Sequence, residues 1–356
     1  MKKNNLLILI SIVFSLFIVE LFCIIFLSNK SDYDYKNRYM IFSEGKTFNN
    51  VDNFFTYHPN QKITAANYYY KEGKFLDVYK YNIYTNNLGL VQKNNLNKKT
   101  PSILFLGDSF TEGQGSKSWI NNFDGMHNEY QIINGGLLGT GFQQFELMDN
   151  HLKNYNIKKV FVLFIGDDLR RDIFQFNKGQ LECLNDHQLC LGTEGFYGFP
   201  ISKEDPSLFL KNLRIKQISN YQKNKQTFKS LRRNIKFKIT NLNIIKIPNE
   251  FLKTNFYKSK NEKILRNFDS IKNFIKKYNE NIYFIHLKMK GEIINGKKSY
   301  ESIYAQKYIK NLSKNYFECK FENNLNYFFE YDEHPNKEGY DNLYNCVLNI
   351  FKEQNL

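Results

Sequence analysis

The sequence predicts an α/β protein built around a parallel sheet. From Pro101 onward, apolar segments of strand length alternate with segments of helical periodicity, a pattern typical of parallel βαβ units. Small polar residues follow the first of these strands, at the position where open α/β sheets carry their chemistry. The chain has 356 residues, 42% of them hydrophobic, which is enough for one large core.

The N-terminus carries a segment that is expected to span a membrane. Residues 6–27 are almost uniformly apolar and have the length of a transmembrane helix, whereas the core of a secretory signal is shorter. Lys2 and Lys3 precede the segment, which places the N-terminus in the cytoplasm. We therefore expect residues 1–30 to form an uncleaved single-pass anchor, with the rest of the chain extracytoplasmic. Three basic residues after the span weaken this charge asymmetry: Lys30, Lys36 and Arg38.

Residues 31–100 are expected to form a stalk and a β-rich lead-in. The first of them are polar, and residues 38–99 are rich in Tyr, Phe and Asn, with little helical periodicity. Side chains alternate over Tyr79–Tyr84 as in a strand, and residues 86–89 have the composition of a turn. This part is expected to pack against an α/β domain over residues 101–356.

The expected strands of that domain are Ile103–Leu106, Gln131–Ile133, Val160–Ile165 and Asn281–Leu287, with a short last strand at Tyr316–Cys319 or Tyr327–Phe329. Apolar residues at helical spacing predict helices over 264–278 and 336–351. Residues 172–262 form a Lys-rich insertion that is expected to contain one or two helices. Such a segment either shapes the mouth of a site or is a solvated basic helix pair without a specific partner.

Two short motifs at opposite ends of this domain carry candidate catalytic residues. Gly107-Asp108-Ser109 follows the first strand, and by itself this motif is typical of a turn. Asp332-Glu333-His334-Pro335 lies before the last helix. A serine needs a base to attack an ester at neutral pH, and an imidazole can take the proton and return it. A carboxylate orients that imidazole, so Ser109, His334 and Asp332 form a candidate catalytic triad.

The motifs resemble those of the SGNH (GDSL-type) hydrolases. Ser109 lies in a block that matches the first block of that family, and residues 134–139 (Asn-Gly-Gly-Leu-Leu-Gly) resemble the second. Gly166-Asp167-Asp168 falls where the third block is expected, and Asp332 and His334 match the fifth. The resemblance covers about residues 100–356. It implies a flavodoxin-like three-layer fold and an oxyanion hole that includes the amides of Ser109 and Gly139.

The resemblance also implies an activity. It suggests a serine esterase that removes O-acyl groups of the acetyl type from envelope or extracellular glycans, without a metal or nucleotide cofactor. Two alternatives remain open at this point. One is acyl transfer to a sugar hydroxyl, because an acyl-enzyme can react with water or with an alcohol. The other is a non-catalytic glycan-binding protein on the same fold.

The sequence departs from the family pattern at two positions. Asp167 stands where the third block has an asparagine, and an ionised aspartate cannot donate to an oxyanion. It must therefore be protonated, be turned away, or leave the oxyanion to the Ser109 and Gly139 amides. Arg170 and Arg171 could neutralise it and are also candidates for substrate binding. The orienting carboxylate, Asp332, stands two residues before His334 instead of three, so a Ser–His dyad or an unusual triad geometry is an alternative.

Two further side chains near the motifs have expected positions. Glu112 is expected to cap the helix after Ser109, because carboxylates favour a helix N-terminus. His286 lies at the end of an expected strand and is a weaker candidate for approach to the site.

The five cysteines predict disulfide chemistry and no zinc site. Cys183 and Cys190 bracket a polar loop, which suits a small disulfide loop in an oxidising compartment. Cys319 and Cys346 could form a second bridge, and the sequence alone leaves this pairing open. The histidines are scattered and no Cys-x-x-Cys occurs, so a zinc site is not expected.

The net charge of +15 does not indicate a nucleic-acid-binding protein. A basic chain is attracted to polyanions in general, but no basic motif with interleaved aromatic residues is present. Attraction to anionic lipid or acidic polysaccharide fits better, although Lys, Asn, Ile and Tyr are abundant throughout, which is typical of a general compositional bias.

Overall fold

The computed structural model describes residues 37–43, 45–125, 129–190, 198–201, 205–225, 262–319 and 324–354, together with the isolated positions 11, 14, 15 and 18. The contacts divide the chain into two units, one of residues 1–36 and 207–261, the other of residues 37–206 and 262–356. The expected membrane segment, residues 6–27, lies outside the described residues except at those isolated positions. Within the described part, no helix combines the length and the apolar character that crossing a membrane requires. The 20-residue helix α5 (Pro206–Lys225) lies almost entirely in the first unit.

A five-stranded parallel sheet forms the centre of the second unit. Its strands are β6 (Ser102–Gly107), β7 (Gln131–Gly136), β8 (Ile157–Phe164), β10 (Ile282–Leu287) and β11 (Tyr316–Cys319). The order across the sheet is β11-β10-β8-β6-β7, and every ladder is parallel. Numbered along the domain, this is the order 2-1-3-4-5 of flavodoxin-like sheets. The parallel α/β core predicted from the sequence is therefore confirmed.

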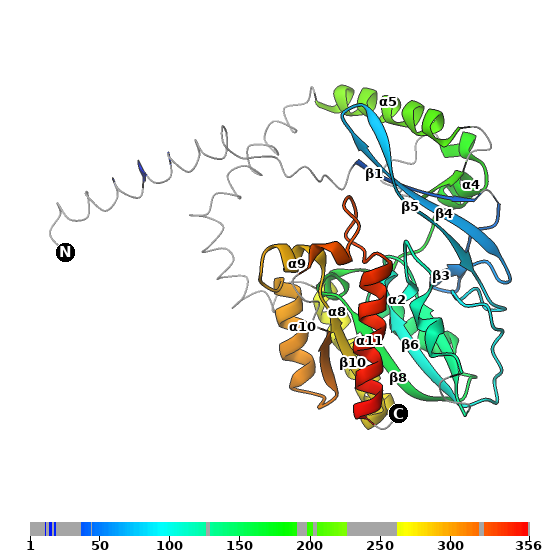
Figure 1. Ribbon diagram of the computed structural model, residues 1–356, viewed down its shortest axis with the longest axis vertical. Coiled ribbons are helices and arrows are strands. Elements are labelled where there is room, and N and C mark those ends of the chain that lie inside the picture. The colour runs from blue at the N-terminus through cyan, green and yellow to red at the C-terminus, as the bar shows by residue number, and fades with distance from the viewer. Residues whose placement is uncertain are drawn as a thin grey trace. The chain divides into compact units, whose positions relative to one another are not determined.

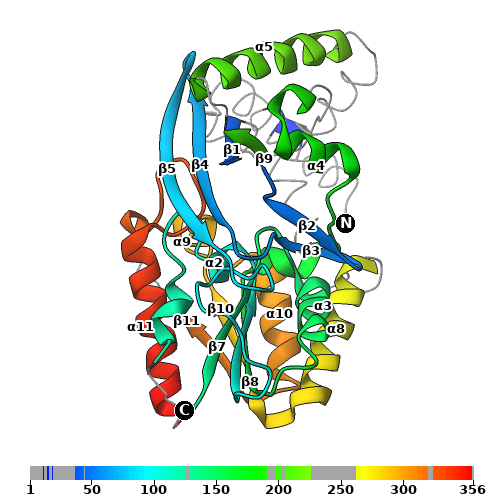
Figure 2. The same cartoon turned by 90° about the vertical axis from the view of Figure 1, so that its right-hand side faces the viewer.

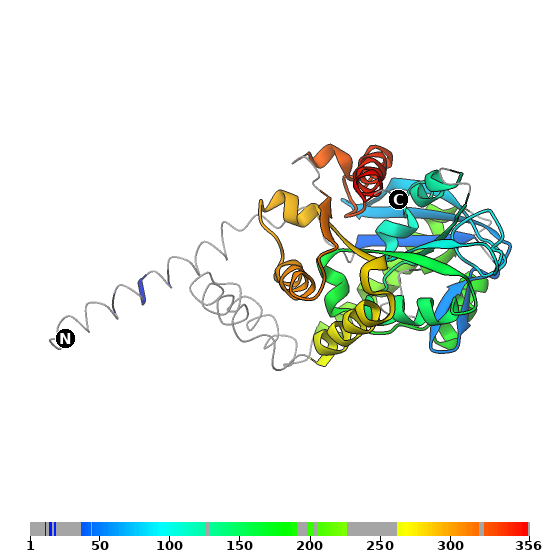
Figure 3. The same ribbon diagram turned by 90° about the horizontal axis from the view of Figure 1, so that it is seen from below.

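Helices cover both faces of this sheet, which gives three layers. Helix α11 (Lys337–Glu353) and the 3-10 turn η3 (Trp119–Phe123) pack on one face, where Phe351 stacks on Phe161 with ring centroids 4.5 Å apart. The opposite face is covered by three helices: α3 (Phe142–His151), α8 (Glu262–Tyr278) and α10 (Tyr300–Lys310). Figures 2 and 3 show α11 on one side of the sheet and α8 and α10 on the other.

The lead-in forms a second sheet and a separate hairpin. Its strands are β1 (Arg38–Ser43), β2 (Phe48–Val51), β3 (Phe54–Tyr57), β4 (Lys62–Lys71) and β5 (Lys74–Tyr84). The second sheet has the order β5-β4-β1-β9, in which β9 is Gly198–Ile201, and β2 pairs with β3. Figure 1 shows the long β4–β5 hairpin next to β1, above the strands of the parallel sheet in this view.

Strand β9 (Gly198–Ile201) comes from the insertion and was not expected from the sequence. It pairs in parallel with β1, with Met40 opposite Gly198 and Ser43 opposite Ile201. The insertion therefore contributes to the second sheet instead of forming helices alone. Of the two alternatives for the last core strand, the structure has Tyr316–Cys319, whereas Leu325–Tyr327 is a 3-10 turn, η8.

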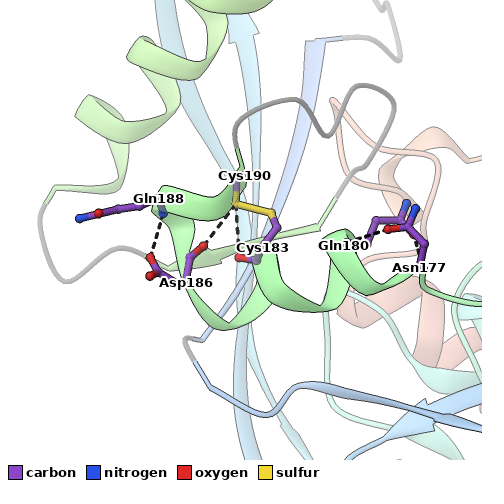
Figure 4. Close-up of a disulfide and its surroundings, with 6 residues drawn as sticks. All are labelled: Asn177, Gln180, Cys183, Asp186, Gln188 and Cys190. Carbon is purple, nitrogen blue, oxygen red and sulfur yellow. Dashed lines mark hydrogen bonds between the residues drawn. A yellow bond between two sulfur atoms is a disulfide. The ribbon is translucent and has the colours of Figure 1, made fainter.

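Two disulfides are present in the second unit. Cys183 in α4 (Lys178–Asn185) is bonded to Cys190 in the 3-10 turn η5 (His187–Cys190), with the two Cα atoms 4.5 Å apart. Figure 4 shows this bridge closing the short connection through Asp186. The expected Cys183–Cys190 pair is thus confirmed. Cys319 in β11 is bonded to Cys346 in α11, which ties an outer strand to the closing helix.

Candidate active site

The candidate catalytic residues lie where the strand order of the parallel sheet reverses. β6 lies between β7 and β8, so the segments that follow β6 and β8 leave neighbouring strands at the same edge of the sheet. Ser109 follows β6 after a single residue, Asp108, and the segment 166–168 follows β8. Crevices at such switch points are the usual ligand sites of open α/β sheets.

A close backbone approach shapes the turn that carries Ser109. A Cβ atom at Gly107 would lie 1.9 Å from the Thr111 hydroxyl and 2.5 Å from the Leu163 carbonyl oxygen, so only glycine fits there. The Asp108 carboxylate accepts from the Phe110 amide at 2.9 Å and caps helix α2 (Ser109–Glu112). Ser109 is therefore the first residue of a helix, and it is only 5% exposed to solvent.

His334 connects the serine to the carboxylate. Its Nε2 lies 2.7 Å from Ser109 Oγ, and its Nδ1 bonds to Asp332 Oδ1. The same Oδ1 accepts from the His334 backbone amide at 3.0 Å. The short Asp-x-His spacing therefore works because one oxygen binds both the amide and the ring of the same residue. The structure brings all three predicted residues together, and the geometry of a Ser–His dyad without a carboxylate is not observed.

The loop that carries Asp332 and His334 is tied to its neighbours. Lys290 donates to the backbone carbonyls of Glu330 and Asp332, at 2.8 and 3.3 Å. The Phe329 amide donates to the His334 carbonyl at 3.1 Å, and the Phe110 ring packs 5.3 Å from the imidazole. These contacts limit the orientations that the His334 ring can adopt.

Asp332 is a fully buried carboxylate with several donors. Its Oδ2 forms an ion pair with Arg38 Nε at 3.0 Å. The same oxygen accepts hydrogen bonds from Asn67 Nδ2 at 2.5 Å and from the Tyr79 hydroxyl at 3.2 Å. Burial by itself would raise the pKa of Asp332, but Arg38 and His334 outweigh burial and hold that pKa well below its usual range. Asp332 is therefore ionised and fixed between His334 and the lead-in sheet.

The second motif forms a loop beside the nucleophile turn. The Leu137 amide donates to the Gly107 carbonyl at 3.0 Å, which places this loop at the end of β6. Gly139 has a φ of +71°, a conformation that favours glycine. Neither the Ser109 nor the Gly139 amide donates a hydrogen bond to an acceptor within the described ranges.

Glu112 fixes this loop. The sequence predicts that Glu112 caps the helix after Ser109, and this prediction is wrong. Glu112 ends helix α2, where its Oε2 accepts from the Leu138 amide at 2.8 Å and its Oε1 from the Tyr57 hydroxyl at 2.9 Å. Asp108 takes the capping position instead. Burial raises the pKa of Glu112 to about 8, against the lowering effect of these two hydrogen bonds.

Arg171, a candidate for substrate binding from the sequence, joins three loops. Its Nη1 lies 2.8 Å from Asp108, 2.8 Å from the Thr140 carbonyl and 2.6 Å from Asp168. Burial raises the pKa of Asp168, and the charge of Asp108 adds to this effect while Arg171 opposes it. One guanidinium thus holds the ends of β6 and β8 and the Gly139 loop together.

Asp167 is paired with Arg170. The carboxylate accepts from Arg170 Nε at 3.1 Å and from Nη2 at 2.8 Å, and the Arg170 side chain is 55% exposed. Partial burial, followed by the charge of Asp167, raises the pKa of Glu333, the residue before His334. Of the alternatives that the sequence left open, the structure has the ion pair with Arg170.

Several residues of the site were not found by sequence reasoning. Arg38, Asn67 and Tyr79 contact Asp332 from the lead-in, and no motif marks them. His286, a weak candidate from the sequence, bonds to Ser302 at 3.0 Å and makes no contact with Ser109 or His334 within the described residues. The described part of the chain also contains no cluster of three or more His, Cys, Asp or Glu side chains suited to a metal.

Comparison with known proteins gives distant structural similarity. No protein-family model and no curated protein sequence matches the chain. A lipase/acylhydrolase from Enterococcus faecalis aligns with 71% of this chain and 96% of its own, at 10% identity and a TM-score of 0.36. A member of the lipolytic protein G-D-S-L family from Veillonella parvula DSM 2008 aligns with 71% of this chain and 98% of its own, at 11% identity and a TM-score of 0.34. Similarity at this level does not determine an activity.

The raised pKa of Glu112 predicts a pH-dependent loss of stability. The folded protein keeps this proton up to about pH 8, whereas the unfolded chain loses it near pH 4.5. The free energy of unfolding should therefore fall as pH rises through this window, by roughly 4 kcal/mol for this group. Glu112→Gln cannot ionise, so urea unfolding at pH 5 and pH 8.5 should show a smaller loss for the variant. Glu182→Gln, at an exposed position, should behave as wild type; equal losses for Glu112→Gln and wild type would contradict the assignment.

Proposed function

We propose that this protein is a serine esterase. The observation that carries the proposal is the continuous hydrogen-bonded chain from Ser109 through His334 to the buried Asp332. A nucleophile bonded to a base, with the base bonded to an orienting carboxylate, is the arrangement that acyl transfer requires. These residues lie at a strand-order switch point, and the amides of Ser109 and Gly139 are the candidate oxyanion donors.

In the acylation step, Ser109 Oγ attacks the ester carbonyl carbon and passes its proton to His334 Nε2. The carbonyl oxygen becomes an oxyanion, which the amides of Ser109 and Gly139 stabilise. Asp332 stays ionised and stabilises the imidazolium through Nδ1. When the tetrahedral intermediate collapses, the bond to the leaving alcohol breaks and His334 returns the proton to that alcohol, which leaves an acyl group on Ser109.

In the second step, His334 takes a proton from water, and the water oxygen attacks the acyl carbon. Collapse of the new intermediate releases the acid and returns the proton to Ser109. A sugar hydroxyl could replace water without any change in the roles of the residues, which would make the protein an O-acyltransferase. Product analysis with and without a sugar acceptor separates these two reactions.

For the substrate, we propose O-acyl esters of the acetyl type on envelope or extracellular glycans, with the chain anchored through residues 6–27. The apolar N-terminal segment and the resemblance to SGNH hydrolases support this assignment. The two disulfides support an oxidising, extracytoplasmic compartment, because disulfides are rare in the cytosol. The positive net charge suits an anionic membrane or an acidic glycan.

A non-catalytic glycan-binding protein is the second candidate, and the Asp167–Arg170 ion pair favours it. An aspartate held in an ion pair supplies no hydrogen-bond donor to an oxyanion. Loss of one such donor typically costs roughly 2.7–4 kcal/mol of the barrier. The esterase proposal therefore requires the Ser109 and Gly139 amides to stabilise the oxyanion without help from Asp167.

Substitution of the nucleophile or the base tests the esterase directly. Hydrolysis of a short-chain aryl ester by residues 31–356 should fall about ten-thousandfold in both Ser109→Ala and His334→Ala, because triad members act as a unit. Ser116→Ala, a nearby serine outside the hydrogen-bonded chain, serves as the control and should keep wild-type activity. Comparable turnover in Ser109→Ala and wild type would reject the mechanism.

Substitution of Asp167 tests the composition of the oxyanion hole. Asp167→Asn replaces a paired carboxylate by a group that can donate, so kcat/KM for the aryl ester should rise, by about a hundredfold or more if the amide reaches the oxyanion. Arg170→Gln frees the Asp167 charge and should lower the activity. If Asp167→Asn abolishes turnover while the protein stays folded, the carboxylate has a positive role in the reaction.

A further inference from the structure

The contacts of Asp332 show that its environment is built by strands outside the parallel-sheet domain. Asn67 in β4 and Tyr79 in β5 are direct partners across the antiparallel ladder. The register shifts next to this pair, between Asn67 and Tyr68, and leaves Val78 between paired positions. Bulges of this kind re-aim side chains next to functional sites. Both side chains donate to the same oxygen, Asp332 Oδ2.

Arg38, at the start of β1, adds a positive charge to these two donors. Its Nε lies 3.0 Å from Asp332 Oδ2, and its side chain is 10% exposed while that of Asp332 is fully buried. Its Nη2 also lies 3.3 Å from the Tyr79 hydroxyl. Burial and the Asp332 charge raise the pKa of Tyr79, so this hydroxyl stays protonated and remains a donor.

We propose that Arg38 is a positioning residue that acts through Asp332: it fixes the orientation of the His334 imidazole and sets the pH range in which this ring is a free base. Asn67 and Tyr79 hold the shared carboxylate oxygen in place, so the lead-in sheet is part of the catalytic unit. This inference rests on the proposed esterase for its kinetic readout, and a spectroscopic readout tests it independently.

Other charged and titratable groups face this pair, but none of them replaces Arg38. Lys290 from α9 (Lys290–Ile294) binds the backbone carbonyl of Asp332, whereas Arg38 binds the carboxylate itself. The remaining groups are Ser109 in α2, Tyr79 in β5, Tyr340 in α11, Glu333 in the same loop and Asp167 after β8. Among the described residues, Arg38 is the arginine or lysine whose side chain is bonded to the Asp332 carboxylate.

Removal of the Arg38 charge should affect His334 in one direction only. A carboxylate beside an imidazole favours the charged imidazolium, and a guanidinium on the far oxygen weakens that effect. Removal of the Arg38 charge leaves the negative charge of Asp332 compensated by His334 alone. The imidazolium then persists to higher pH, and less of the enzyme has a free base in the acidic range.

The test compares Arg38→Gln and Arg38→Lys with wild type. In Arg38→Gln the acid limb of the pH profile of kcat/KM should move up by about one pH unit. Its kcat at the optimum should fall ten- to hundredfold, with a much smaller change in KM, because the base is less well oriented. Arg38→Lys keeps the charge, so its acid limb should lie close to that of wild type. Arg266→Gln removes an exposed arginine paired with Asp172 and should leave the limb unchanged.

An NMR titration of the His334 ring gives the same information and does not depend on catalytic activity. The signal of this ring is assigned by its loss in His334→Gln. The midpoint of this titration should move up in Arg38→Gln and return in Arg38→Lys. If Arg38→Gln does not fold, Tyr79→Phe removes one donor from Asp332 and should move the midpoint in the same direction by a smaller amount. A folded Arg38→Gln protein with an unchanged midpoint and limb would overturn the proposal. If wild type shows no Ser109-dependent hydrolysis, the esterase fails, and the NMR midpoint still decides the role of Arg38.

Discussion

The structure depends on one buried charge, the carboxylate of Asp332. An isolated ionised carboxylate in a protein interior is very costly, and removal of one partner from a buried pair typically destabilises by roughly 3–5 kcal/mol. Here both oxygens are used: His334 binds one, and Arg38, Asn67 and Tyr79 bind the other. Because those three residues belong to the lead-in sheet, the two sheets must pack together for the site to exist.

The sequence predicts the parallel sheet well because its strands are buried on both faces. All six residues of β6 are buried, so the strand reads as a continuous apolar run, and the predicted Ile103–Leu106 lies one residue inside each observed end. Strand β9 has four residues and contains Pro200, so it gives no comparable signal. Its pairing with β1 is a tertiary contact that local periodicity cannot reveal.

The site shows the same difference between local sequence motifs, which can be predicted, and long-range contacts, which cannot. Ser109, Asp332 and His334 could be predicted because motifs at strand and helix ends mark them, and the fold then brings them into one hydrogen-bonded chain. Arg38 and Asn67 could not be predicted, because their contacts with Asp332 join distant parts of the chain; Asn67 and Asp332 are 265 residues apart in sequence. The pairing of Asp167 with Arg170 was one of the alternatives that the sequence left open.

The most direct test of this account is covalent labelling with a fluorophosphonate, followed by peptide mass spectrometry. A serine activated by His334 attacks the phosphorus, fluoride leaves, and a stable adduct remains on the oxygen. We expect one adduct on Ser109 in wild type and its loss in His334→Ala. An unlabelled wild-type protein, or an adduct on another serine such as the buried Ser302, would contradict the claim that Ser109, His334 and Asp332 form a working catalytic unit.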